Sequence, residues 1–197
     1  MTPTQPESGP RNGAALRTFF ALWPDAGARD ALSALAGEIA ARTRGRAPAA
    51  GNLHLTLAFL GDVVPARLAV LRAIGAAVAA AVPRFALVFD RVGAFGEAGI
   101  AWAGASAPPR ELERLAQLLQ VALANEGFPI ERRPFHPHVT LARRCRSHAG
   151  AGSAAPIPWN VERIALNASE RSPHGPRYRE LDAWPLGLQL PGGTTLS

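Results

Sequence analysis

Two stretches of the sequence alternate apolar and polar residues around the same His-x-Thr-Leu tetrad. They are "NLHLTLAFLG" (52–61) and "FHPHVTLAR" (135–143). Side chains on a strand point alternately to its two faces. Each stretch therefore predicts a strand with one aliphatic face for the core and one face that carries an imidazole beside a hydroxyl. The residues that share the polar face are His54 with Thr56 and His138 with Thr140.

Other apolar patterns predict a chain that mixes strands with helices. Apolar runs bounded by turn residues predict strands, and apolar residues at three- and four-residue spacing predict helices. The further strands expected are 16–24, 84–95 (ending in a turn), 99–106, 159–169 and a last strand in 172–186, and the helices are 25–42, 65–82 and 108–126. Gly and Pro predict loops at 43–52 and from the second motif to about Pro158.

The segment 108–126 is the clearest of the predicted helices. One stripe of its surface is apolar, and Gly127 follows where a C-cap would lie. The stripe consists of Leu112, Leu115, Leu118, Leu119 and Ala122.

Strands interrupted by single helices favour an α+β fold with antiparallel or mixed sheets. Each half of the chain supplies strands and helices around one His-x-Thr strand. We therefore predict one domain over 15–186, made of two similar lobes that face each other across a cleft. The polar segment 1–14 and the segment 187–197 are expected to be tails, and 1–14 lacks the apolar core of a secretory signal.

Composition changes this picture in two ways. The only cysteine is Cys145, which excludes an internal disulfide and favours a reducing, cytoplasmic setting. It lies among arginines that could lower the pKa of its thiol, although a surface position is the simpler interpretation.

The net charge is +6 and all 21 basic residues are arginine. This favours a phosphate ligand, or reflects only a GC-rich genome.

Two imidazoles and two hydroxyls across a cleft suit phosphoryl chemistry. One histidine can take a proton from water while the other donates one to the leaving oxygen, and hydroxyls can hydrogen-bond the phosphate oxygens. A lone His-x-Thr is a weak signal, but two copies in a chain with five histidines are not. A zinc site at His54, His136 and His138 is an alternative, although no cysteine or carboxylate cluster lies near them in the sequence.

With these motifs the chain resembles the two-histidine phosphoesterase superfamily, and within it the RNA 2′,3′-cyclic phosphodiesterases, or LigT-type 2′-5′ RNA ligases. The resemblance extends over about 17–186, through "RTFFALWP", "NLHLTLAFLG", "AWAG", "RPFHPHVTLAR" and "YRELDAWPL". It implies a bilobal α+β fold with antiparallel sheets, flanked by helices, around a central cleft. It also implies hydrolysis of 2′,3′-cyclic phosphate to a 2′-phosphomonoester without a metal or cofactor.

The resemblance further implies a role for each tetrad residue. His54 corresponds to the donor of a proton to the leaving 3′ oxygen, and His138 to the base that activates water. Thr56 and Thr140 correspond to the residues that bind the phosphate. Without the resemblance, the motif residues do not distinguish which histidine is the proton donor and which is the base.

Five more residues are candidates for substrate contact. Arg143 could reach the phosphate, and Tyr178 could line the cleft. Trp102 and Phe135 could stack on a base, or could be core residues at strand ends. His136 could contact phosphate, although a surface role is favoured. His148 and His174 are expected on the surface.

The expected partners are RNA ends or small nucleotides that carry a 2′,3′-cyclic phosphate. We expect a monomer and no membrane, since no apolar run approaches the roughly 18 residues of a membrane span. Two alternatives remain: an RNA- or nucleotide-binding module with little or no catalysis, and the reverse 2′-5′ ligation.

Overall fold

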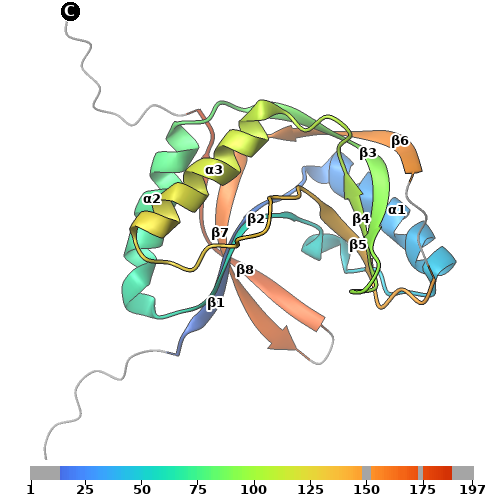
Figure 1. Ribbon diagram of the computed structural model, residues 1–197, viewed down its shortest axis with the longest axis horizontal. Coiled ribbons are helices and arrows are strands. Elements are labelled where there is room, and N and C mark those ends of the chain that lie inside the picture. Colours follow the sequence, from blue (N-terminus) through green and yellow to red (C-terminus); the bar gives the residue numbers. More distant parts are fainter. Residues whose placement is uncertain (1–13, 148–151, 173–174, 188–197) are drawn as a thin grey trace, which may run out of the picture.

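The computed structural model describes residues 14–147, 152–172 and 175–187. Within them lie eight β-strands, three α-helices and two 3₁₀ turns (Figure 1). In chain order they are β1 (Leu16–Leu22), α1 (Ala26–Thr43), η1 (Ala50–Asn52), β2 (Leu55–Val63), η2 (Pro65–Arg67), α2 (Leu68–Ala80), β3 (Phe85–Phe95), β4 (Ile100–Gly104), α3 (Arg110–Asn125), β5 (Val139–Arg143), β6 (Gly152–Val161), β7 (Arg163–Ser172) and β8 (Gly175–Pro185).

The described strands form one antiparallel sheet in the order β6-β3-β4-β5-β2-β1-β7-β8. It divides into two four-stranded halves, which meet where β2 lies beside β5. Along the described parts of these two strands, one pair of residues is in register, Leu55 with Val139. Each of these residues directly follows a motif histidine, so equivalent points of the two motifs meet at the centre of the sheet. The predicted α+β fold with two antiparallel lobes is confirmed.

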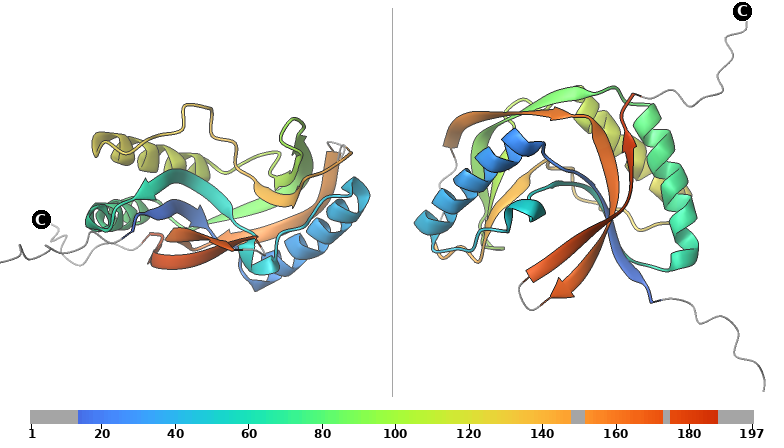
Figure 2. Two further views of the ribbon diagram at one scale, coloured as in Figure 1. Left: turned by 90° about the horizontal axis from the view of Figure 1, so that it is seen from below. Right: turned by 180° about the vertical axis from the view of Figure 1, so that it is seen from behind.

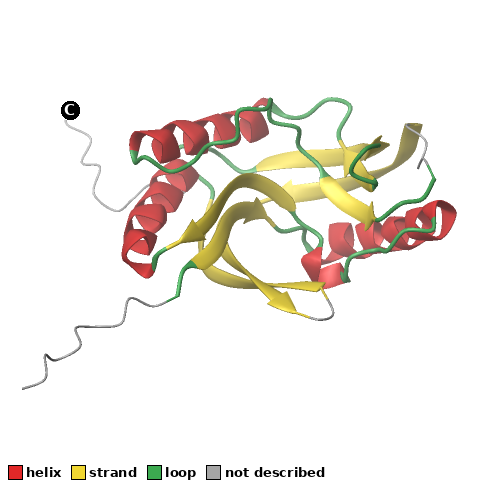
Figure 3. Ribbon diagram, turned by 60° about the horizontal axis from the view of Figure 1, so that its bottom comes forward, coloured by secondary structure: helices red, strands yellow, loops and turns green. Residues whose placement is uncertain are grey.

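The helices tie the two halves together. Although α1 connects β1 to β2, it packs against β5 and β6 of the other half. Likewise α3 connects β4 to β5, yet it packs against β2 and against α2. The helices consequently gather at opposite ends of the sheet (Figure 3). Each half covers apolar surface of the other, so the two halves should unfold as one cooperative unit.

Local sequence explains where the long helices begin and end. The Asp25 carboxylate accepts a hydrogen bond from the backbone N–H of Ala28 at 2.8 Å and caps α1. Gly127 has a φ of +71° just after α3, which confirms the predicted C-terminal stop. The predicted apolar stripe of α3 faces the core, where Leu112, Leu115 and Leu119 are fully buried.

The loop predicted from the second motif to about Pro158 is wrong in its last part. Residues from Gly152 onward already form β6, which lies at an edge of the sheet and pairs only with β3. Proline lacks an N–H, but an edge strand has one unpaired side, so Pro156 and Pro158 are tolerated there. The single strand predicted for 159–169 is also wrong, because Glu162 separates β6 from β7. The chain bends there from one half of the sheet into the other (Figure 2).

The turn predicted at the end of 84–95 is wrong as well. The strand β3 continues without interruption to Phe95. Glycine at position 93 allows the indole of Trp102 on β4 to pack against the β3 backbone, because the indole occupies the space that a Cβ atom would fill. The two motif strands begin later than predicted, at Leu55 and Val139, so each motif histidine directly precedes its strand. The remaining predicted strands and helices agree with the structure to within a few residues.

The predicted tails fall almost entirely outside the described residues, as do His148 and His174. The sheet itself runs from Leu16 to Pro185. Among the described helices, none is long and apolar enough to cross a membrane.

Candidate active site

The His-Thr pairs lie on either side of the pairing at the centre of the sheet. Leu55 and Val139 are fully buried and point to the core. Thr56 and Thr140 lie on these strands and point to the opposite face, since side chains alternate along a strand. His54 and His138 directly precede the strands and line the same cavity as the threonines, and all four residues are partly buried. The antiparallel register places His54 across from Thr140, and Thr56 across from His138. The four polar residues thus form an approximately two-fold arrangement.

Each histidine is held by a carbonyl two residues before it. The Nδ1–H of His54 donates to the carbonyl oxygen of Asn52 at 2.7 Å, and that of His138 donates to the carbonyl oxygen of His136, also at 2.7 Å. A carbonyl oxygen only accepts, so Nδ1 carries the hydrogen in both rings. The Nε2 atoms are left to exchange protons with a ligand.

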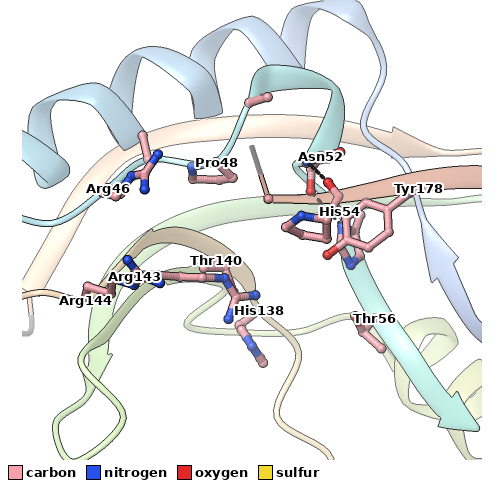
Figure 4. A pocket seen from close by; sticks show the side chains of 14 residues that line it. Arg46, Pro48, Asn52, His54, Thr56, His138, Thr140, Arg143, Arg144 and Tyr178 are labelled. Carbon is pink, nitrogen blue, oxygen red and sulfur yellow. Dashed lines mark hydrogen bonds between the residues drawn. The ribbon is translucent and has the colours of Figure 1, made fainter. Parts of the chain in front are cut away.

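One cavity of about 440 Å³ is lined by both histidines and both threonines (Figure 4). The loop before η1 and η1 itself form one wall, with Arg46 and Pro48 from the loop and Asn52 from η1. The end of β5 and the start of β8 complete the lining. These two segments contribute Arg143, Arg144, Pro176 and Tyr178.

Aromatic rings enclose His54. The ring centroids of Phe19, Trp23 and Tyr178 lie 5.2, 5.0 and 4.9 Å from the centroid of its imidazole. The indole N–H of Trp23 donates to the Asn167 side chain at 3.1 Å, which fixes this ring. Burial disfavours the charged imidazolium and lowers the pKa of His54 to about 4, against the opposing effect of the Asn52 carbonyl.

His138 has a more open environment. Its ring contacts Phe95 at 5.1 Å and the imidazole of His136 at 6.0 Å between centroids. Burial is the main cause that lowers the pKa of His138, and the charges of His136 and Arg143 add to it. The positive charge of Arg143 also lowers the pKa of His54. Arg143 therefore acts on both histidines.

The other predicted contacts divide into two groups. Arg143 and Tyr178 line the cavity, whereas Trp102, Phe135 and His136 do not. The Trp102 indole packs over Gly93 and Gly104 and against His136, at 4.7 Å between rings. Trp102 is half-buried in the middle of β4, so its role in stacking on a base stays a prediction. Phe135 is exposed, so the core position considered for it is wrong. His136 is exposed as well, which agrees with the surface position favoured for it.

Several residues around the cavity are not predictable from the sequence pattern. Arg46 is brought there by reciprocal backbone hydrogen bonds with Arg143, at 2.8 and 3.0 Å. Asn52 donates from its side chain to the carbonyl oxygen of Pro176 at 2.9 Å, which ties the β7–β8 hairpin to the cavity wall. Both are long-range contacts. The one local signal was "APAAGN", a Pro- and Gly-containing loop that leads directly into the first motif.

The zinc alternative required His136 beside His54 and His138. In the part of the chain that the structure describes, no group of three His, Cys, Asp or Glu side chains is placed to hold a metal ion.

Two lobes that each present a His-Thr pair to one cavity define a phosphoesterase-like class of fold and site. Residues 24–172 match the family model of the 2′-5′ RNA ligase superfamily, and the chain belongs to this family. The resemblance inferred from the motifs is thereby confirmed.

Curated relatives and solved structures agree with this assignment. Over 149 residues the chain is 37% identical to the RNA 2′,3′-cyclic phosphodiesterase of Escherichia coli K12, which covers 72% of this chain and 80% of that protein. The enzyme of the same name from Geobacillus stearothermophilus is 36% identical over 154 residues, which is 73% of this chain and 48% of that one. The crystal structure of E. coli LigT complexed with 3′-AMP has a TM-score of 0.81 and 32% identity, and covers 88% of this chain and 99% of that one.

Proposed function

We propose that the protein hydrolyses 2′,3′-cyclic phosphate ends of RNA to 2′-phosphomonoesters, with one cyclic phosphate held between His54 and His138. The observation that carries the proposal is the single cavity shared by the two His-Thr pairs, with Arg143 acting on both imidazoles. The curated relatives are named for this activity, which is that of a hydrolase.

In the proposed reaction the threonine hydroxyls and Arg143 hydrogen-bond the non-bridging phosphate oxygens. The Nε2 atom of one histidine removes a proton from water as the water oxygen bonds to phosphorus. The bond from phosphorus to the 3′ oxygen breaks, and the Nε2–H of the other histidine protonates that oxygen. The product is a 2′-phosphomonoester with a free 3′ hydroxyl. The donors are in place before charge accumulates on the phosphate, which is why they favour the transition state.

The direction of proton transfer depends on the protonation of His54. The family resemblance makes His54 the acid and His138 the base. However, the low pKa of His54 keeps its ring neutral near pH 7 in the free protein. A bound phosphate anion favours the imidazolium and raises this pKa. We therefore propose that substrate binding charges His54, so that the acid forms only in the occupied site.

The proposed direction has a kinetic consequence. The pH dependence of kcat/KM reports ionisations of the free enzyme, and that of kcat reports those of the complex. The group that must be protonated should therefore show a higher apparent pKa in kcat than in kcat/KM. Equal values in the two profiles would contradict charging of His54 by the substrate.

The activity itself is tested with adenosine 2′,3′-cyclic phosphate in the presence of EDTA, with the product identified by chromatography. The expected product is adenosine 2′-phosphate. The variants His54→Ala and His138→Ala should each lose about a hundredfold or more of kcat/KM, as is usual for a general acid or base. Full turnover in either variant would contradict the assignment, and strict metal dependence would contradict the mechanism. Binding without turnover in the wild type would favour a binding module.

The proposed working form is a monomer in the cytoplasm. The cavity is complete within one chain, and a single cysteine suits a reducing compartment. Light scattering after size-exclusion chromatography should give the monomer mass of 20.7 kDa. A stable dimer would contradict this part of the proposal.

A further inference from the structure

One end of the cavity carries more positive charge than a cyclic phosphate requires. Arg46, Arg143 and Arg144 line this end, and no acidic side chain lines the cavity within the described chain. The ion pairs recorded among described residues involve other arginines. A 2′,3′-cyclic phosphate is a diester with a single negative charge. Its binding therefore leaves positive charge unmatched in the cavity.

The three arginines occupy different positions relative to the histidines. Burial is the main cause of the pKa shifts at these groups, downward at His54 and His138 and upward at Tyr178. The positive charge of Arg143 favours a lower pKa at all three, so its guanidinium belongs with the reacting phosphate. Arg46 and Arg144 contribute to none of these shifts. They lie toward the end of the cavity away from His54 and Tyr178 (Figure 4). They are therefore available to an anionic group at some distance from the reacting phosphorus.

The backbone holds both outer arginines at the cavity. Arg46 is fixed beside Arg143 by two backbone hydrogen bonds. The next residue along a regular strand would point away from the face that Arg143 uses. Arg144 instead has a φ of +56°, in the left-handed region that non-glycine residues seldom adopt, and it lines the same cavity as Arg143. An uncommon backbone conformation at the rim of a cavity is a feature often linked to function.

We infer that Arg46 and Arg144 form a second phosphate subsite, which binds the phosphate on the 5′ side of the terminal nucleoside. The inference rests on the proposed function, because the cyclic phosphate occupies the His-Thr end at the same time. A cavity of about 440 Å³ is of the size that holds a nucleotide-like ligand. The planar guanidinium offers paired donors that match phosphate oxygens. In an RNA substrate the ligand of this subsite is the last internucleotide phosphodiester.

The test compares three substrates that share one cyclic phosphate. The first is adenosine 2′,3′-cyclic phosphate with a free 5′ hydroxyl, the second carries an added 5′-phosphate, and the third is the dinucleotide adenylyl-adenosine 2′,3′-cyclic phosphate. The wild type should favour both phosphate-bearing substrates over the first by about tenfold or more in kcat/KM, mainly through KM. If kcat/KM rises equally for both phosphate-bearing substrates, the subsite binds any phosphate. If kcat/KM rises for the dinucleotide alone, the subsite binds the RNA backbone.

Charge-removing variants then locate the subsite. The preference is the ratio of kcat/KM for the dinucleotide to kcat/KM for adenosine 2′,3′-cyclic phosphate. Arg46→Gln and Arg144→Gln should each lower this ratio about threefold to tenfold, and the double variant should bring it close to one. Arg114→Gln is the matched control, since this exposed arginine of α3 does not line the cavity. Its preference should equal that of the wild type.

A binding measurement makes the result independent of turnover. Calorimetry should show adenosine 2′,5′-bisphosphate binding at least about tenfold more tightly than adenosine 2′-phosphate, and the double variant should lose this difference. Equal affinities and equal kcat/KM values in the wild type would overturn the subsite, as would a preference that survives in the double variant. Absence of hydrolysis of all three substrates would instead overturn the proposed function, while the calorimetry still decides on the subsite.

Discussion

The two His-Thr pairs have the same local geometry but different surroundings. Each histidine donates its Nδ1–H to a carbonyl two residues earlier, at the same 2.7 Å. Yet His54 is enclosed by three aromatic rings, whereas His138 lies beside Phe95 and the exposed His136. The pKa of His54 accordingly falls to about 4. A repeated motif thus fixes how a ring is held, while other elements decide when it carries a proton.

After the loss of either histidine itself, the largest effect should come from the hydroxyls, where the two pairs are expected to be equivalent. Thr56→Val and Thr140→Val each remove a donor to the phosphate while keeping a β-branched shape. We expect each to lower kcat about a hundredfold, comparable to the loss of one oxyanion donor. Steady-state kinetics with a 2′,3′-cyclic nucleotide measure this. A large loss in one variant and none in the other would show that the pairs are not equivalent.

The burial of His54 should appear in the pH dependence of stability. Its pKa is about 4 in the folded protein and near 6.5 in the unfolded chain, so the unfolded chain binds more protons between these values. The free energy of unfolding therefore decreases as the pH falls from 6.5 toward 4, by about 1–3 kcal/mol from this group.

Urea unfolding at several pH values tests the effect of His54 against the variant His54→Gln. The variant lacks the titrating group, so the difference in stability between the two proteins should change across this pH window. A difference that stays constant with pH would show that burial does not lower this pKa.

Removing one wall of the aromatic enclosure should make His54 more like His138. Tyr178→Ala exposes the imidazole to water and leaves the bond to the Asn52 carbonyl in place. The pKa of His54 should rise by about one unit, because desolvation is the main cause of its low value. NMR titration of the ring measures it, with Tyr178→Phe as the control that keeps the ring. An unchanged pKa in Tyr178→Ala would indicate a cause other than burial.

The smallest effect is expected at His136. Its backbone carbonyl holds His138, and the variant His136→Ala keeps that carbonyl. The ring is lost with its contact to Trp102 and its charge near His138, which should raise the pKa of His138 slightly and change kcat/KM by less than about threefold. A loss comparable to that of the threonine variants would place the His136 ring in the reaction.

The features that the sequence predicted depend on local periodicity. The shared face of each His-Thr pair follows from the alternation of side chains, and the burial of Leu55 and Val139 agrees with it. The apolar stripe of α3 and its end at Gly127 are equally local.

The features that it missed depend on contacts between distant segments. Arg46 reaches the cavity through pairing with Arg143, and Arg144 through a left-handed turn that no glycine or asparagine signalled. The break at Glu162 lacks glycine or proline, so the sequence predicts one continuous strand where the structure has two. The aromatic enclosure of His54 combines residues of β1 and β8, which are adjacent to neither motif in sequence.

The central claim is that both histidines act on one phosphate, and a titration of ¹⁵N-labelled protein with adenosine 2′-phosphate tests it most directly. The ring nitrogen signals of His54 and His138 are assigned with the variants His54→Gln and His138→Gln. With one equivalent bound, the Nε2 signals of both rings should shift together along one saturation curve, and the pKa of His54 should rise. A shift confined to one histidine, or two curves with different affinities, would contradict the account.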